Sequence, residues 1–160
     1  MDDKIYIPEG EQTDAPASQI GATLEALAKT IHARRAAGEK SYTYLLLTDL
    51  IEAPAKKLVE EATEVAFAAK DADYATYFAR EAADVAVGTE TAEKLDEQVT
   101  DTLNHLRYEA ADVVYHLLVI LERFGITTDE LAAELNMRMK EGERPRGAVL
   151  LPESEVNRGK

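Results

Sequence analysis

The chain has 160 residues, of which 46% are hydrophobic and 31% are charged, a composition typical of one soluble globular domain. Its formal net charge of −13 repels nucleic-acid backbones, and its lack of cysteine excludes a disulfide scaffold and a thiolate metal site. The apolar runs fall short of the roughly 18 to 20 residues that a membrane span needs. We therefore expect a cytoplasmic protein with no nucleic-acid or membrane partner.

The chain opens with an irregular stretch and a first predicted helix. Residues 1–17 contain proline and glycine with little periodicity, which predicts a flexible N-terminal arm. Ser18 is a plausible N-cap for a helix over about 19–37, and Gly38 ends it. Arg34 lies in the last turn, where it either interacts with the helix dipole or has a functional role. The apolar positions at helical spacing are Leu24, Leu27, Ala28 and Ile31.

Two further helix starts follow. Ser41 predicts the N-cap of a short second helix, and Pro54 suits the first turn of the third. The triplet Ser-Tyr-Thr at 41–43 would lie at an exposed helix start, where free N–H groups and hydroxyls can meet a phosphate. On the residues alone, this triplet predicts only a cap.

The third predicted helix carries an acidic patch. In the segment 56–70, Glu60, Glu61 and Glu64 fall inside one arc of roughly 100°. Lys57 precedes two of them by three and four residues, so its ammonium reaches the same face. A solvated acidic face is the simpler interpretation unless a second group of carboxylates lies opposite. The residues expected to form the buried face of this helix are Leu58, Ala62, Val65 and Ala69.

Two later segments carry a Glu-x-x-Asp pair that can face this patch. The first pair is Glu81 and Asp84, and the second is Glu109 and Asp112. In each pair the acids are three residues apart, so they are neighbours on a helix surface. Gly88 follows the first pair and weakens a helix, whereas a tyrosine, a histidine and a run of large aliphatic residues follow the second. We therefore favour the second pair and keep the first as its alternative.

The predicted helix that carries Glu109 and Asp112 would be unusually long if it were unbroken. A single helix over 91–124 would be about 50 Å long, so we predict a bend or break near Asn104. The segment 73–87 is then expected to form an extra helix of its own.

The last predicted helix opens with a capping box made by Thr127 and Glu130, and it runs to about Met139. Leu131 and Leu135 are expected to point inward from it. From 141 to 160, Gly, Pro and Arg dominate, which predicts a C-terminal tail or an arm across a partner subunit.

The predicted helix that carries Glu109 and Asp112 is otherwise strongly apolar, so its carboxylates need a stabilising partner. A carboxylate taken from water without a partner costs several kcal/mol, so the economical arrangement is two antiparallel helices whose carboxylates face each other across a divalent metal ion. Hard oxygen ligands without cysteine suit Mg²⁺, or Mn²⁺, better than zinc.

Four segments in a fixed order carry a family resemblance. They are SYTYLLL (41–47), KKLVEEATEV (56–65), YEAADVVYHLLVIL (108–121) and GITTDELAAEL (125–135). Together they resemble the phosphoribosyl-ATP pyrophosphatase family of histidine biosynthesis, within the all-α nucleoside triphosphate pyrophosphatases that share EExxE and ExxD motifs. The resemblance runs from about residue 23 to residue 138.

The resemblance implies an all-α fold, a four-helix-type bundle completed by dimerisation. It places the domain over 18–140. The stretch between Glu64 and Glu109 is longer than the family's spacing, so residues of about 71–105 contain an insertion.

The resemblance also implies a Mg²⁺-dependent enzyme that hydrolyses phosphoribosyl-ATP to phosphoribosyl-AMP and pyrophosphate, the second step of histidine biosynthesis. Glu60 is then a candidate for supporting the ligands or activating water. For His116, a core histidine bonded to a carbonyl or to Asp112 is the alternative to a substrate contact. The implied residues are Glu60, Glu61 and Glu64 for catalysis, Glu61, Glu64, Glu109 and Asp112 for the metal, and Arg34, Tyr42, Lys57 and His116 for the nucleotide substrate.

Three other functions are the alternatives. A house-cleaning pyrophosphatase acting on dUTP or damaged nucleotides shares both acidic motifs, and a non-catalytic helical dimerisation module needs neither. A carboxylate-bridged di-iron protein would need Glu-x-x-His on two helices. None of the three histidines has a glutamate three residues earlier, which argues against this function.

Overall fold

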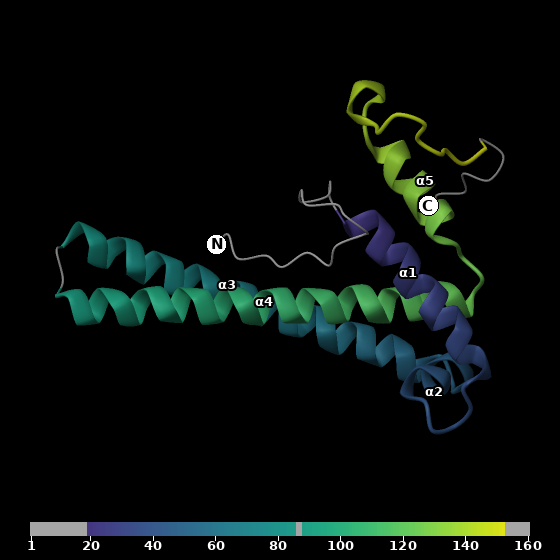
Figure 1. The fold of residues 1–160 in the computed structure, drawn as a ribbon, viewed down its shortest axis with the longest axis horizontal. Coiled ribbons are helices and arrows are strands. Elements are labelled where there is room, and N and C mark those ends of the chain that lie inside the picture. Colours follow the sequence, from purple (N-terminus) through teal and green to yellow (C-terminus); the bar gives the residue numbers. More distant parts are fainter. Residues whose placement is uncertain (1–18, 86–87, 153–160) are drawn as a thin grey trace, which may run out of the picture.

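The protein is an assembly of helices dominated by one long antiparallel hairpin (Figure 1). The structure is a computed structural model that describes residues 19–85 and 88–152, and over these residues it has no strand, so the all-α prediction is confirmed. The predicted arm over 1–17, the cap Ser18 and the end of the tail over 153–160 lie outside the described residues. The helices are α1 (Ile20–Ala33), η1 (Arg34–Ala36), α2 (Tyr42–Thr48), α3 (Glu52–Asp84), α4 (Thr89–Arg123), α5 (Thr128–Arg138) and η2 (Glu141–Glu143).

The hairpin of α3 and α4 corrects two predictions. The segment 73–87 was expected to be a separate helix, but the residues up to Asp84 continue α3 without interruption. The break expected near Asn104 is also wrong, because α4 runs unbroken through this position. Helices kink mainly at proline, glycine or inserted side chains, and α4 contains no proline or glycine. The described residues of the predicted insertion, 71–85 and 88–105, therefore form the outer part of the hairpin.

The hydrophobic core lies at the end of the hairpin far from its tip, where α1 and α2 pack against α4 (Figure 1). Ile31 of α1 is 1% exposed and Val119 of α4 is fully buried, so two helices distant in sequence meet at large side chains. Leu24 and Leu27 pack against this core at the helical spacing that the sequence predicted. The buried core residues are Ile31, Leu46, Leu47, Leu118 and Val119.

Several predicted helix ends are confirmed. The Ser41 hydroxyl accepts a hydrogen bond from the Tyr44 N–H at 3.3 Å, and α2 begins there. Thr127 and Glu130 form the predicted capping box of α5. Gly38 has a φ of 75°, a left-handed conformation that a glycine adopts without strain, and it follows the short η1 turn that ends the first helical region.

The helix α5 differs from the prediction in its inner face. Leu135 was expected to point inward but is 49% exposed, whereas Ala133 and Asn136 are buried. The reason is that the chain after α5 turns back. The Asn136 side-chain N–H donates to the Val149 carbonyl at 2.9 Å, and Arg144 Nε donates to the Asn136 carbonyl at 2.8 Å. Asn136 thus holds the described part of the predicted tail, 141–152, against α5.

A cluster of hydrogen bonds links α1 and η1 to the C-terminal end of α4. Arg35 Nε lies 2.5 Å from the Glu122 carboxylate, Arg35 Nη2 donates to the Glu122 carbonyl at 2.6 Å, and His32 Nδ1 lies 3.0 Å from the same carboxylate. Burial alone would raise the pKa of Glu122, but the hydrogen bonds from Arg35 and His32 outweigh it and the pKa is lowered.

We expect Glu122→Gln to lower the free energy of unfolding at pH 7 by about 1 to 2 kcal/mol, the scale of hydrogen bonds to a charged group. Because the pKa of Glu122 is lower in the folded state, its contribution is present above the ordinary glutamate pKa and is lost as the pH falls through the folded value. Urea unfolding at pH 7 and at pH 3 measures this, and the two proteins should converge at pH 3. A difference that persists at pH 3 would contradict the assignment.

Candidate metal and nucleotide site

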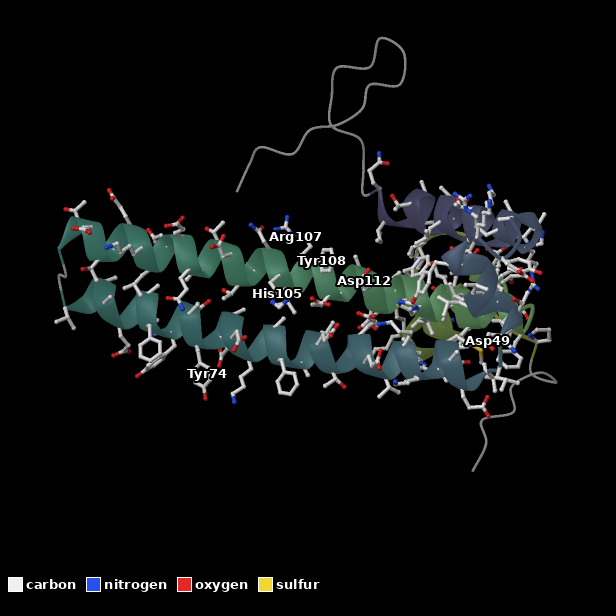
Figure 2. All side chains as sticks on the ribbon, turned by 90° about the horizontal axis from the view of Figure 1, so that it is seen from below. Asp49, Tyr74, His105, Arg107, Tyr108 and Asp112 are labelled. Carbon is white, nitrogen blue, oxygen red and sulfur yellow. The ribbon has the colours of Figure 1, made fainter. Side chains whose placement is uncertain are left out.

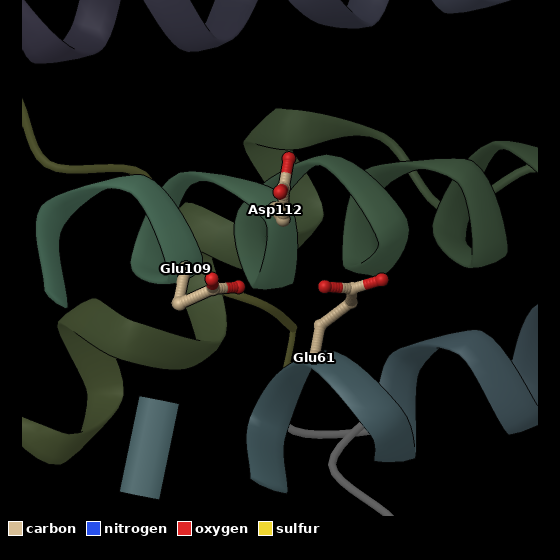
Figure 3. Close-up of side chains that lie close together, drawn as sticks. All are labelled: Glu61, Glu109 and Asp112. Carbon is tan, nitrogen blue, oxygen red and sulfur yellow. The ribbon is translucent and has the colours of Figure 1, made fainter. Parts of the chain in front are cut away.

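Three carboxylates from two helices converge beside the core. Glu61 comes from α3, and Glu109 and Asp112 come from successive turns of α4 (Figure 3). One oxygen of each carboxylate lies within 4.8 Å of the other two. Glu61 is 6% exposed and Glu109 is 7% exposed, so these acids have left bulk water. Buried carboxylates this close repel one another unless a cation lies between them.

The packing of α3 against α4 explains why Glu61 points inward. Ala68, Ala72 and Ala75 follow Glu61 by 7, 11 and 14 residues, so all four positions share one side of the helix, and all four are buried. Small side chains let the helices approach closely.

This side is not the buried face that the sequence predicted. Of the expected residues, Leu58 and Val65 are only partly buried, while Ala62 and Ala69 are exposed. The prediction is wrong because α3 meets α4 through small residues and the site carboxylate, not through its larger aliphatic side chains.

Lys57 is the cation of the acidic patch. Its Nζ lies 2.8 Å from Glu61 Oε1 and 3.2 Å from Glu60 Oε2. The Glu61 and Glu60 carboxylates accordingly raise the pKa of Lys57 above its ordinary value. In return, the hydrogen bond from Lys57 lowers the pKa of Glu61, and Lys57 and Lys56 lower the pKa of Glu60. Glu60 and Glu61 are therefore ionised at neutral pH.

Glu64 lies one turn beyond Glu61 on α3 and is exposed, outside the group of three convergent oxygens. Its pKa is raised, first by a hydrogen bond shared with Glu61 and also by the charge of Glu109. These two influences show that Glu64 borders the cluster. A cation bound there would reverse this shift, because it favours the charged carboxylate.

His116 and Tyr42 form an aromatic wall of the site. His116 is 4% exposed, its Nε2 lies 3.7 Å from Glu61 Oε1, and burial lowers its pKa. The Tyr42 ring meets the His116 ring edge-on, with centroids 6.2 Å apart, and burial raises the pKa of Tyr42. His116 Nδ1 is buried with no hydrogen-bond partner among the described residues, so this nitrogen is not bonded to a carbonyl or to Asp112, as the alternative interpretation of a core histidine would have it.

Arg34 is the predicted site residue that the structure does not bring to the carboxylates by any observed contact. Its side chain is exposed on η1, and the neighbouring Arg35 is the residue that binds α4, through Glu122.

The sequence reading missed His105. Its Nε2 lies 2.9 Å from Glu109 Oε1, one turn later on α4. His105 lies on the same helix as Asp112 (Figure 2). The spacing of four residues was the available signal, because such residues are neighbours on a helix surface.

The alternative acidic pair lies elsewhere. Glu81 and Glu61 are on the same helix, 20 residues apart, which corresponds to about 30 Å along the axis. Asp84 is the last residue of α3, at the tip of the hairpin. Of the two pairs, Glu109 and Asp112 are therefore the one that lies beside Glu61 in the described part of a single chain.

The donor set fits a hard divalent cation. All three convergent ligand atoms are carboxylate oxygens, which Mg²⁺ and Mn²⁺ prefer, and a fourth carboxylate, Glu64, borders them. The site thus combines a group of carboxylates that can bind a cation, the ammonium group of Lys57 and the rings of Tyr42 and His116.

Comparison with known proteins gives matches to one family. A family model described as phosphoribosyl-ATP pyrophosphohydrolase matches residues 24–139. Phosphoribosyl-ATP pyrophosphatase 1 of Bradyrhizobium diazoefficiens is 38% identical over 117 residues, covering 72% of this chain and 83% of the relative. The phosphoribosyl-ATP pyrophosphatase of Paracidovorax citrulli is 33% identical over 128 residues, covering 78% and 75%.

A third relative, the phosphoribosyl-ATP pyrophosphatase of Methylobacterium nodulans, is 37% identical over 117 residues, covering 72% of this chain and 82% of the relative. No solved structure matches significantly. None of the described helices combines the length and apolar character of a membrane span. Since the family model and these relatives each match more than two thirds of the chain, the protein belongs to the phosphoribosyl-ATP pyrophosphohydrolase family.

Proposed function

We propose that the protein is a Mg²⁺-dependent hydrolase that cleaves the bond between the α- and β-phosphates of phosphoribosyl-ATP and releases pyrophosphate and phosphoribosyl-AMP. The observation that carries this proposal is the convergence of Glu61, Glu109 and Asp112 within 4.8 Å, in a chain of this family. Phosphoryl transfer depends mainly on positioning and charge neutralisation, and this site offers the groups for both.

The proposed ligands are Glu61, Glu109 and Asp112, with Glu64 completing the set. When bound, Mg²⁺ supplies neutralisation of phosphate charge and acidifies a water molecule. Glu60 is kept ionised by Lys57 and Lys56, so its carboxylate is available to accept a proton or to orient water.

Lys57 is the proposed phosphate contact. Its ammonium already bridges two carboxylates, and a phosphate placed beside it would replace or share these contacts. Tyr42 and His116 line the same side of the site and are proposed to contact base, ribose or phosphate. His116 is uncharged at neutral pH because burial lowers its pKa, so it contributes hydrogen bonds and not charge.

We include in the proposal a homodimer or larger homo-oligomer and a cytoplasmic location. Helices that build a site between them and leave apolar surface exposed commonly complete their core with a second copy.

The deciding experiment compares two substrates. Pyrophosphate release is measured with phosphoribosyl-ATP and with dUTP, each with Mg²⁺, with Mn²⁺ and with excess chelator. We expect release from phosphoribosyl-ATP that requires the divalent cation. Preference for dUTP would instead support a house-cleaning pyrophosphatase, and no release from either nucleotide would support a non-catalytic helical module.

A further inference from the structure

One residue of α4 links the two members of the aromatic wall, Tyr42 and His116. The hydroxyls of Tyr115 and Thr43 form a hydrogen bond of 2.8 Å, in which either oxygen can be the donor. The Tyr115 ring also meets the His116 ring edge-on, with centroids 5.0 Å apart and an interplanar angle of 79°. Thr43 follows Tyr42 in the chain. Tyr115 therefore contacts His116 directly and reaches Tyr42 through one intervening residue.

The helix α2, which carries Tyr42, depends on its contacts with the rest of the chain. It has seven residues, and isolated helices shorter than about 12 to 15 residues are marginal in water. Its C-terminal half is held in two ways. Leu46 and Leu47 are buried in the core, and Arg123 Nη1 of α4 donates to the Leu46 carbonyl at 3.2 Å.

The N-terminal end of α2 is held less firmly. Tyr42 is the first residue of the helix and is 52% exposed, so its own burial fixes its position only weakly. The Ser41 cap bonds within the helix and not to another element. Among the described residues, the bond between Thr43 and Tyr115 is the side-chain hydrogen bond that joins this end to another helix. Without it, the first turn of α2 could shift relative to α4.

We propose that Tyr115 is a positioning residue for the nucleotide substrate. Its hydroxyl holds the start of α2 and its ring supports His116, so that Tyr42 and His116 keep a fixed arrangement beside the carboxylates. The inference rests on the proposed function, in which these two rings contact phosphoribosyl-ATP. Tyr115 is partly buried and packs against the core, which makes it a rigid support. Side chains ordered in advance raise affinity, because less conformational freedom is lost when the substrate binds.

The first test uses kinetics to separate positioning from folding. Tyr115→Phe and Thr43→Val each remove one hydroxyl and nearly keep the shape of the side chain. Each is expected to raise the KM for phosphoribosyl-ATP about fivefold, the factor that corresponds to a net value of about 1 kcal/mol for one hydrogen bond, with little change in kcat. A hydrogen bond with only a structural role would lower the free energy of unfolding and leave the KM unchanged well below the unfolding temperature. An unchanged KM in both variants would overturn the proposal.

The helix itself supplies matched controls. The Thr48 hydroxyl donates to the Tyr44 carbonyl within α2, so Thr48→Val makes the same chemical change without touching the link to α4, and its KM should match that of wild type. Thr43→Ser keeps the hydroxyl and should also keep the wild-type KM. The double variant Tyr115→Phe/Thr43→Val should resemble either single variant, because both lose the same hydrogen bond. An equal loss in Thr48→Val, a loss in Thr43→Ser, or additive losses in the double variant would each contradict the assignment.

The second test observes the aromatic wall directly and needs neither substrate nor metal. The rings of Tyr42 and His116 meet edge-on with centroids 6.2 Å apart, so their protons should show a nuclear Overhauser effect in wild type. This effect should weaken in Tyr115→Phe and in Thr43→Val and persist in Thr43→Ser and in Thr48→Val. An effect of equal strength in all of these proteins would sink the proposal, whatever the activity.

This spectroscopic measurement also distinguishes failure of the inference from failure of the proposed function. If the ring contact responds as expected but wild type releases no pyrophosphate from phosphoribosyl-ATP, the proposed function fails and the substrate role of Tyr115 is overturned with it. If wild type releases pyrophosphate and the ring contact does not respond, the proposed function stands and the inference about Tyr115 is wrong.

Discussion

Asp112→Asn is expected to lower Mg²⁺-dependent pyrophosphate release by at least about 100-fold, because the change removes one of three convergent carboxylates and its charge. Asp84→Asn makes the same chemical change in the other Glu-x-x-Asp pair and serves as the matched control. Asp84 ends α3, far along the hairpin from Glu61, so this variant should keep most of the activity.

The two variants are compared by initial rates across a Mg²⁺ titration, with circular dichroism as the check on folding. The Asp112→Asn protein should fold normally, because the loss of one charge from a group of three carboxylates relieves repulsion. Retained activity in Asp112→Asn would remove this residue from the ligand set. If Asp84→Asn loses activity and Asp112→Asn does not, the metal-ligand role would belong to Glu81 and Asp84. One chain by itself does not bring that pair to Glu61.

Lys57→Met should reduce kcat/KM for phosphoribosyl-ATP by roughly 10- to 150-fold. This factor corresponds to a loss of about 1.5 to 3 kcal/mol of transition-state stabilisation, the scale of a hydrogen bond to a charged group. The loss should appear mostly in the apparent affinity for substrate, with the Mg²⁺ dependence little changed. Lys56→Met is the control on the same helix. Its ammonium is 3.4 Å from Glu60 and its side chain is 78% exposed, so its removal should change the kinetics little. Equal kinetics in the two variants would reduce Lys57 to an ion-pair partner of Glu60 and Glu61.

The structure adds a stability effect to this prediction. Lys57 is the main cause of the lowered pKa of Glu61, so its removal leaves a buried carboxylate without its cation. A lowered folded-state pKa stabilises the protein above the ordinary glutamate pKa, and the contribution is lost as the pH falls through the folded value. Lys57→Met should therefore be less stable than wild type at pH 7, and the difference should shrink below about pH 4.

The sequence predicted several helix ends and the closeness of Glu61, Glu109 and Asp112 because both depend on local spacing. Cap residues such as Ser41 and Thr127 make their hydrogen bonds within one turn, so their roles can be read without a fold. The placement of Glu61 opposite Glu109 followed from a single requirement, that buried carboxylates need a common cation.

The side of α3 that meets α4 could not be predicted in this way. This helix has apolar residues on more than one side, and periodicity alone cannot tell the side that packs within the chain from one that remains outside. The close approach at Ala68 and Ala72, and the exposure of Phe67 beside them, depend on which helix lies opposite. The contact between His105 and Glu109 was missed because an exposed histidine four residues from an acid is common on helices.

The buried alanines of α3, Ala68, Ala72 and Ala75, also determine where the hairpin opens first. A methyl group removes little apolar area from water, so each residue near the tip contributes less to local stability than Leu118 or Val119 does near the core. In a single copy, the end of α3 and the start of α4 are expected to unfold locally at a free energy below that of global unfolding. Such excursions leave the carboxylates in place, because the large side chains that fix the base of α4 lie on the other side of the site.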